Sequence, residues 1–223
     1  MFWTLVLCHL LADYPLQTDA IVEAKKRMPG LLWHVAIHLL TMLVVVVGLV
    51  ATDWRLAAPC VLAISACHFA IDYWKNILSA LRPRWGIFIY VQDQALHLLS
   101  ILGLSAWAEA GDVAFPSEPR WAIPALGYVL VTYTAFVTER VFYFHRDPRY
   151  CGWITLQSRT RMVSRAVLLS ALFVGWNAWG LIVIIVGLAY HWWDLVGPYR
   201  FRALVTDAIV VAAVMSLCIL AAR

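Results

Sequence analysis

The sequence predicts an all-α polytopic membrane protein with about seven transmembrane helices. Its 223 residues are 63% hydrophobic and only 13% charged, and the mean hydropathy is +0.78. Soluble domains do not reach this balance. A membrane-spanning helix needs ~20 predominantly apolar residues. The chain offers such stretches at residues 1–20, 31–51, 57–79, 87–107, 121–144, 164–190 and 204–222.

The first stretch begins at Met1 with no basic segment and no small-residue cleavage site, so we expect a retained span rather than a signal peptide. It carries His9 and Asp13, four residues apart. Each of the next three stretches carries one pair with the same spacing. These pairs are His34 with His38, His68 with Asp72, and Asp93 with His97.

Two side chains four residues apart stack on one helix face, about 6 Å apart along the axis. Such a pair can hold one metal ion. A single pair could equally be an internal ion pair or a packing contact. However, an aspartate at mid-membrane costs ~2.5–3.5 kcal/mol, and bound cations would offset that cost for all three aspartates. We therefore predict one or two divalent transition-metal ions, with zinc, iron and manganese all compatible with a mixed imidazole and carboxylate shell.

The four pairs form an internal repeat of a two-helix hairpin. The first two read H-x3-D-x20-H-x3-H and the last two H-x3-D-x20-D-x3-H. At an offset of 59 residues, His9, Asp13 and His38 match His68, Asp72 and His97. Both hairpins enter from the same side, so a pseudo-two-fold axis along the membrane normal is expected. Four pairs around that axis would form a shell for two metal ions.

The basic residues predict the orientation. Lys25–Arg27, Arg82–Arg84 and an arginine cluster at 140–165 alternate with connections that carry Glu109, Asp112 and Glu118. The positive-inside rule then predicts an N-terminus outside and a C-terminus in the cytoplasm, with all four pairs just under the cytoplasmic surface. The net charge of +4 reflects these connections, and no basic-aromatic motif for nucleic acid occurs.

This orientation has two consequences for the later spans. Arg200 and Arg202 fall outside, against the rule. His191 and Asp194, in the sequence HWWD, also fall outside and are excluded from the metal site. Glu139 could add a carboxylate, but pairing with a nearby arginine is the stronger expectation. The domain prediction is one integral membrane domain, 1–223, with a metal-binding four-helix repeat at 1–107 and a three-helix scaffold at 108–223.

Residues near the pairs are candidates to support the ligands or to bind substrate. Lys75 could hold an anionic substrate group, although a lysine near a helix end also snorkels to the headgroups. The five cysteines form no CxxC motif, and small buried hydrophobes are the better interpretation. The full set of supporting candidates is Gln17, Lys75, Tyr90, Gln92, Gln94 and Ser100.

Several motifs follow one another in fixed order: HLLADYPLQTD, a lysine cluster, HVAIH, HFAIDYWK and DQALH. Over roughly residues 5–105 they resemble a family of small bacterial membrane proteins catalogued only as a domain of unknown function. The resemblance implies a bacterial inner-membrane protein. It also supports the eight paired residues, Gln17 and Lys75 as signature positions, and it implies no activity.

Three classes of function fit these observations. The first is a metal-dependent hydrolase with two metal ions that acts on a lipid or another membrane-embedded substrate. The second is a metal-ion transporter or sensor, which is disfavoured because the polar residues share one depth and only Asn177 stands apart. The third is a di-iron lipid oxidase or desaturase-like enzyme. Three aspartates among eight ligands favour the hydrolase.

Overall fold

The structure, a computed structural model, describes residues 1–50, 54–110, 118–175 and 178–222. Asp112 and Asn177 therefore lie outside the described residues. Every regular element in these ranges is a helix, which confirms the all-α prediction. Five helices are long and apolar enough to cross a membrane: Met28–Val46, Ala57–Leu81, Pro83–Glu109, Ala122–Tyr143 and Arg200–Ala221. The chain folds as two compact units, Met1–Ala122 and Ile123–Arg223.

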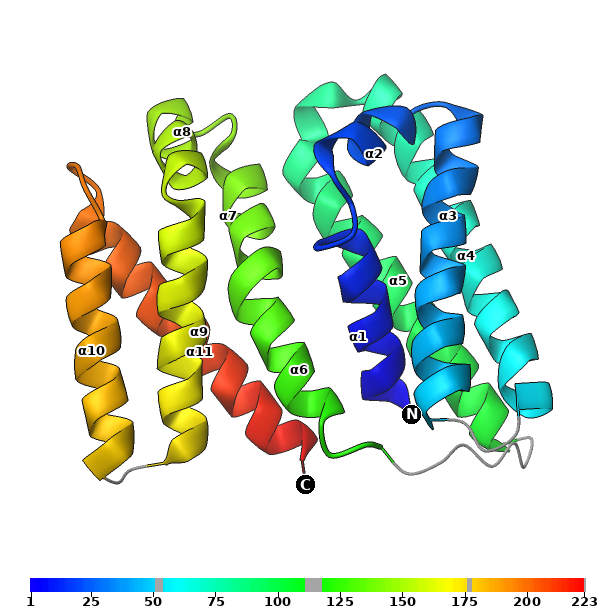
Figure 1. Cartoon of the computed structure of the whole chain (residues 1–223). Coiled ribbons are helices and arrows are strands. Elements are labelled where there is room, and N and C mark those ends of the chain that lie inside the picture. The colour runs from blue at the N-terminus through cyan, green and yellow to red at the C-terminus, as the bar shows by residue number, and fades with distance from the viewer. Residues whose placement is uncertain (51–53, 111–117, 176–177, 223) are drawn as a thin grey trace. The chain divides into compact units, whose positions relative to one another are not determined.

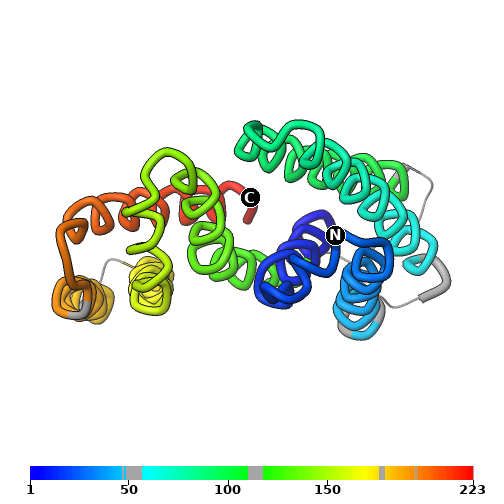
Figure 2. The backbone as a smooth tube through the Cα atoms, turned by 90° about the horizontal axis from the view of Figure 1, so that it is seen from above, coloured from blue at the N-terminus to red at the C-terminus, as the bar shows by residue number. Residues whose placement is uncertain are grey.

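The first unit is a ring of four helices. Helix α1 packs against α3 and α5, and α4 packs against the same two neighbours, as Figure 2 shows from above. A short helix and a 3₁₀ turn form the connections at one end (Figure 1). The elements are α1 (Phe2–Asp13), α2 (Asp19–Ala24), α3 (Met28–Met42), η1 (Leu43–Val50), α4 (Trp54–Leu81), η2 (Pro83–Trp85) and α5 (Gly86–Ala110).

Helix α1 is shorter than the stretch 1–20 that the sequence predicts. It ends at Asp13 because Pro15 has no backbone N–H with which to continue the helical hydrogen bonds. The side-chain amide of Gln17 donates to the Asp13 carbonyl at 2.9 Å, so it replaces the backbone donor that a longer helix would supply. At the other end, Glu118 accepts hydrogen bonds from the backbone N–H groups of Trp3 and Thr4.

The short helix α2 lies close against the start of α3. The Thr18 hydroxyl caps α2 by accepting from the Ile21 N–H at 3.4 Å. A Cβ atom added to Gly30 would lie 2.1 Å from the Ala24 carbonyl oxygen, so only glycine permits this approach. The contact fixes the direction of the chain at Lys25, immediately after α2.

The second unit is built around α9. This helix packs against α10, α11 and η3, while α8 packs against α7. Helices α6 and α7 are joined end to end by the π-helical segment η3. The elements are α6 (Ala122–Val129), η3 (Leu130–Thr134), α7 (Ala135–Tyr143), α8 (Pro148–Leu156), α9 (Ser158–Val174), α10 (Ala178–Asp194) and α11 (Arg200–Ala221).

The predicted single span 164–190 is wrong, because α9 and α10 form an antiparallel hairpin in its place (Figure 1). Helix α9 ends at Gly175, whose φ of 91° lies in the left-handed region. A Cβ atom on Gly180 would lie 2.0 Å from the Gly175 carbonyl oxygen. Apolar composition alone concealed this turn, because both arms of the hairpin are hydrophobic.

The hairpin reverses the predicted position of the following segment. Arg202 Nη1 lies 3.2 Å from Asp147 Oδ2, and the Trp153 indole donates to the Val196 carbonyl at 2.7 Å. The segment after α10 therefore lies at the same end of the second unit as α8, and so does His191 near the end of α10. Placing these residues at the opposite end from the arginine cluster was wrong.

A buried ion-pair network joins α7, α9 and α11. Arg161 Nη2 lies 2.5 Å from Asp207 Oδ1 and 2.9 Å from Glu139 Oε2. Arg165 lies 2.6 Å from Asp207 and 3.0 Å from Glu139, which confirms that Glu139 pairs with arginine. Arg165 also donates to the Val131 carbonyl in η3 at 3.3 Å, where π-helical geometry leaves a backbone acceptor available.

We expect Asp207→Asn to destabilise the protein strongly, because it leaves two buried guanidinium groups facing one carboxylate. Removing one partner of a buried pair costs roughly 3–5 kcal/mol. Thermal unfolding of the purified protein in detergent would measure the loss. Glu23→Gln is the control, since Glu23 is 74% exposed in its pair with Lys26, and its melting temperature should stay near that of the wild type. Equal melting temperatures for both variants would contradict the prediction.

Candidate metal centre

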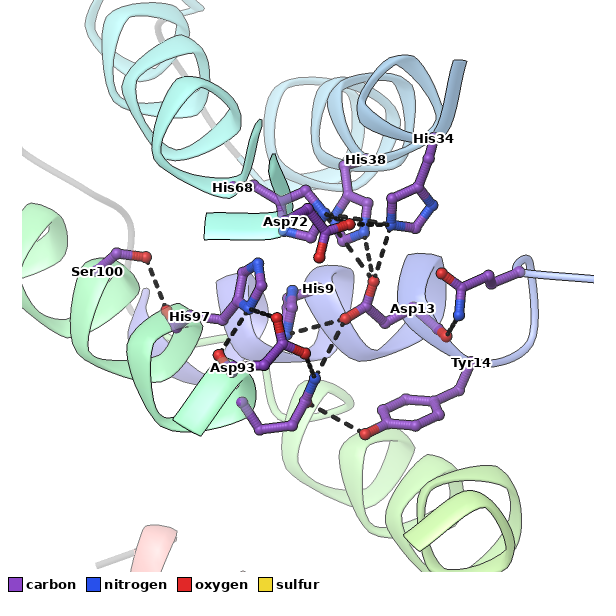
Figure 3. A network of polar contacts seen from close by, with 12 residues as sticks. His9, Asp13, Tyr14, His34, His38, His68, Asp72, Asp93, His97 and Ser100 are labelled. Carbon is purple, nitrogen blue, oxygen red and sulfur yellow. Dashed lines mark hydrogen bonds and ion pairs between the residues drawn. The ribbon is translucent and has the colours of Figure 1, made fainter. Parts of the chain in front are cut away.

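Four helices of the first unit bring the eight predicted ligand residues into one cluster. Helix α1 contributes His9 and Asp13, and each of the other three contributes its own pair (Figure 3). All eight side chains are buried, and none is more than 6% exposed. The i, i+4 spacing explains this, since each pair occupies one helix face and each of those faces points into the ring.

One group of ligand atoms is centred on Asp13. Its Oδ1 lies 3.1 Å from His34 Nε2, 2.9 Å from His38 Nε2 and 4.0 Å from His68 Nε2. The four ligand atoms lie within 4.8 Å of one another. A tetrahedral ion with ligand distances near 2 Å needs its ligand atoms about 3–3.5 Å apart. The group could therefore hold a metal ion after small adjustments.

A second group of ligand atoms consists of His68, Asp72 and His97, again within 4.8 Å of one another. His68 belongs to both groups, so the two candidate positions are adjacent. His9 and Asp93 belong to neither group. His9 nevertheless lies 3.6 Å from Asp13 Oδ2, and its ring stacks on that of His97 with centroids 4.7 Å apart.

The cluster contains buried polar atoms without hydrogen-bond partners. His68 Nε2 and His34 Nε2, which lie 3.2 Å apart, are not among them, because one can donate to the other. Within the described residues, His9 Nε2, His97 Nε2 and one oxygen each of Asp72 and Asp93 have no hydrogen-bond partner. A buried acceptor without a partner costs about 1–3 kcal/mol. One cation can satisfy several of these atoms at once, which a hydrogen bond cannot do.

The tautomer of His97 follows from its neighbour. Its Nδ1 lies 2.8 Å from the Asp93 carbonyl oxygen, and a carbonyl only accepts, so Nδ1 carries the hydrogen. Nε2 of a neutral imidazole then keeps its lone pair and faces the cluster. This orientation by a backbone carbonyl is typical of histidine ligands to metals.

The sequence did not identify Lys25 as part of the cluster. It was interpreted as one of three basic residues that set the orientation, but only 7% of it is exposed. Its Nζ lies 3.2 Å from Asp72 Oδ2 and donates to Gln17 Oε1 at 2.6 Å. The neighbouring Lys26 is 63% exposed. The one available signal was that a lysine cluster accompanies the histidine motifs.

Four of the supporting candidates contact the cluster or its hydrogen-bonded partners. Lys75 Nζ lies 2.6 Å from Asp93 Oδ2, and Gln17 bonds to the Asp13 carbonyl. Gln94 Nε2 donates to Asp93 Oδ2 at 3.1 Å and lies 3.5 Å from Asp13 Oδ2. The Tyr90 hydroxyl lies 2.7 Å from that of Tyr14.

Tyr14 was seen in the sequence only as part of the repeat, yet its hydroxyl also donates to Gln94 at 3.2 Å. Two other candidates do not support the ligands in this way. Ser100 donates to the His97 carbonyl within its own helix. Gln92 is half-buried and has no hydrogen bond to the cluster within the part of the chain that the structure describes.

Removal of metal should destabilise the first unit, because three carboxylates would then share a cavity of low dielectric. We expect chelation to lower the melting temperature, and Asp13→Ala and His97→Ala to lower both metal content and melting temperature. Elemental analysis and thermal unfolding would measure these effects. His191→Ala, in the second unit, is the control and should keep the wild-type metal content. Wild-type protein that is metal-free at full stability would refute the prediction.

A comparison with known families finds a match. A family model described as "Protein of unknown function (DUF3307)" matches residues 1–117, more than half of the 223-residue chain. The matched range contains all eight clustered residues and both lysines. No curated protein and no solved structure matches the chain. The expected resemblance to a family of unknown function is confirmed, and the chain belongs to this DUF3307 family.

Proposed function

We propose that the protein is a dinuclear metal-dependent hydrolase acting on a lipid or another membrane-embedded substrate. The observation that carries this proposal is the pair of adjacent ligand groups in the first unit. Because a neutral imidazole has one free lone pair, His68 would bind one of the two ions and not both. Two divalent ions held there would supply an activated water molecule and would polarise the phosphoryl or carbonyl group that this water attacks. Six buried side chains from four helices would hold them, and zinc, iron and manganese all suit this donor set.

The remaining two residues of the cluster are suited to proton transfer. Asp93 lies outside both ligand groups, and its Oδ1 has no hydrogen-bond partner among the described residues. His9 Nε2 is equally without a partner and lies 3.6 Å from Asp13. A carboxylate or an imidazole in such a position can accept the proton of the attacking water and return it to the leaving group.

The apolar outer surface of the helix ring favours a substrate that lies in the membrane. Large apolar side chains are exposed on several of its helices, including Leu40, Leu62 and Leu99. These surfaces suit contact with acyl chains. The five helices long enough to cross a membrane support an integral membrane location, and we propose the bacterial inner membrane.

A transporter is less well supported. Apart from the cluster and its lysines, the buried polar side chains of the first unit's described residues are Thr4, Ser65 and Ser105. Hydroxyl groups of this kind do not form a path of metal ligands. A di-iron lipid oxidase remains the second candidate, because five of the eight clustered side chains are imidazoles.

We also propose that α1–α3 and α4–α5 are two copies of one hairpin. Residues at the 59-residue offset support this, since His9 and His68, Asp13 and Asp72, and His38 and His97 all enter the same cluster. His34 and Asp93 depart from it, because these equivalent positions hold different residue types. The two candidate metal positions would follow from the duplication.

The α9–α10 hairpin changes the proposed topology. We propose that both of its 17-residue helices cross the membrane, in addition to the spans expected from the sequence. The proposed total is then eight crossings instead of seven. An even number places the start of α1 and the end of α11 on the same side. We propose that this is the outer side, because Arg202 then shares the cytoplasmic side with Arg146 and Arg149, as the positive-inside rule requires.

Purified wild-type protein, prepared without added metal, should contain close to two transition-metal ions per chain and should hydrolyse a lipid ester or phosphoester. Asp72→Asn should lower both properties, because it removes a charged ligand from the second group. Elemental analysis and product detection would measure them. His145→Gln, in the second unit, should change neither. Stoichiometric iron with oxygen consumption, and no hydrolysis, would favour the oxidase.

The topology can be tested with single cysteines placed at Arg84 and after residue 222. Intact cells treated with an impermeant maleimide should show labelling after residue 222 and none at Arg84 until the membrane is opened. Labelling at Arg84 in intact cells would reverse the orientation. Absence of labelling after residue 222 until the membrane is opened would instead return the number of crossings to seven.

A further inference from the structure

Two lysines, the buried Lys25 and the partly buried Lys75, lie against carboxylates of the candidate metal centre, although they come from different parts of the first unit. Lys25 follows α2 and its Nζ lies 3.2 Å from Asp72 Oδ2. Lys75 lies in α4, with its Nζ 2.6 Å from Asp93 Oδ2 and 3.9 Å from Asp72 Oδ1. Both ammonium groups therefore border the second group of ligand atoms.

The position of Lys25 is built into the fold. Gln17 accepts a hydrogen bond from its Nζ at 2.6 Å, and Asn76 donates to its backbone carbonyl at 2.8 Å. The close packing of Gly30 on Ala24 fixes the chain just before it. Lys26, the next residue, instead pairs with Glu23 on the exposed surface. The fold therefore selects one lysine of the cluster and buries it.

These lysines are not explained by metal binding alone. An ammonium group about 3 Å from a carboxylate competes with a metal ion for the same oxygen, and it repels the ion. With neutral imidazoles, three carboxylates and two ammonium groups leave one negative charge. Two divalent ions would turn that into three positive charges in a buried site. Such an excess needs an anionic partner.

We propose that Lys25 and Lys75 bind a phosphoryl group, and that the substrate is a phosphate monoester. The inference rests on the hydrolase function proposed above. A phosphate monoester carries about −1.5 to −2 charges at neutral pH and three acceptor oxygens, which matches the excess positive charge far better than a neutral ester does. Lysine binds phosphate as a point charge without the planar geometry that arginine requires.

The corresponding reaction is hydrolysis of the monoester. The water oxygen forms a bond to phosphorus, and the bond from phosphorus to the alcohol oxygen breaks. One proton of the water ends on the departing alcohol oxygen, and the other stays with the inorganic phosphate. A phosphorylated lipid and a water-soluble phosphate monoester share this chemistry, so the experiment must separate them.

The test measures binding of two probes to detergent-purified, metal-loaded protein by titration calorimetry. The probes are orthophosphate and phosphatidic acid in micelles, with diacylglycerol in the same micelles as the lipid without phosphate. The variants are Lys25→Met and Lys75→Met, which keep an unbranched side chain and remove the charge. Lys25→Arg and Lys75→Arg restore the charge, and Lys26→Met is the matched surface control. Metal content is measured for every variant.

Each methionine variant should bind the phosphorylated probe about tenfold more weakly or worse, while it keeps the wild-type metal content. The arginine variants should recover much of the affinity, and Lys26→Met should bind like the wild type. Binding of phosphatidic acid but not orthophosphate supports a lipid substrate, and equal binding of both supports the phosphoryl group as the recognised element. Diacylglycerol should not compete.

The inference is overturned if wild-type protein binds neither probe, or if the methionine variants bind as tightly as the wild type. It is also overturned if those variants lose their metal, because the lysines would then be structural. The proposed hydrolase fails separately. Lysine-dependent phosphate binding by a protein that holds no metal would refute the dinuclear site and leave the anion site standing.

Discussion

The stability of the first unit depends on how the charges of three carboxylates, buried together with five imidazoles, are compensated in a space that excludes water. Asp13, Asp72 and Asp93 are each at most 6% exposed, and a charge in such a place must be compensated. Lysines compensate part of the charge. Nε2 of His9 and Nε2 of His97 have no hydrogen-bond partner within the described part of the chain. A cation held by these side chains would therefore join the four helices.

The second unit solves the same problem differently. The buried Arg161 and Arg165 each form ion pairs with Glu139 and with Asp207. Two positive and two negative charges therefore balance. His191 lies 3.7 Å from Asp207. Balanced ion pairs of this kind fix helices against each other without an added ion. The charges of this network therefore balance, whereas three carboxylates outnumber the two lysines at the cluster of the first unit.

The sequence predicted the features of this fold that follow from the regular spacing of residues along a helix. Pairs at i and i+4 placed all eight clustered side chains on inward faces, because helix geometry follows directly from spacing. It missed features set by single residues. Gly175 ends α9 inside a continuous apolar stretch, and Pro15 ends α1 after Asp13. Lys25 could not be separated from Lys26 without knowing that α2 turns one of them inward.

The early end of α1 has a consequence for the membrane itself. A helix of 12 residues is about 18 Å long, whereas the hydrocarbon core of a bilayer is about 30 Å thick. If α1 crosses the bilayer, this shortfall would be met by local thinning of the bilayer or by headgroups drawn down beside α1. Asp13, the last residue of the helix, would then lie beside a locally thinned part of the leaflet. There a lipid headgroup could reach the cluster while its acyl chains stay in the bilayer.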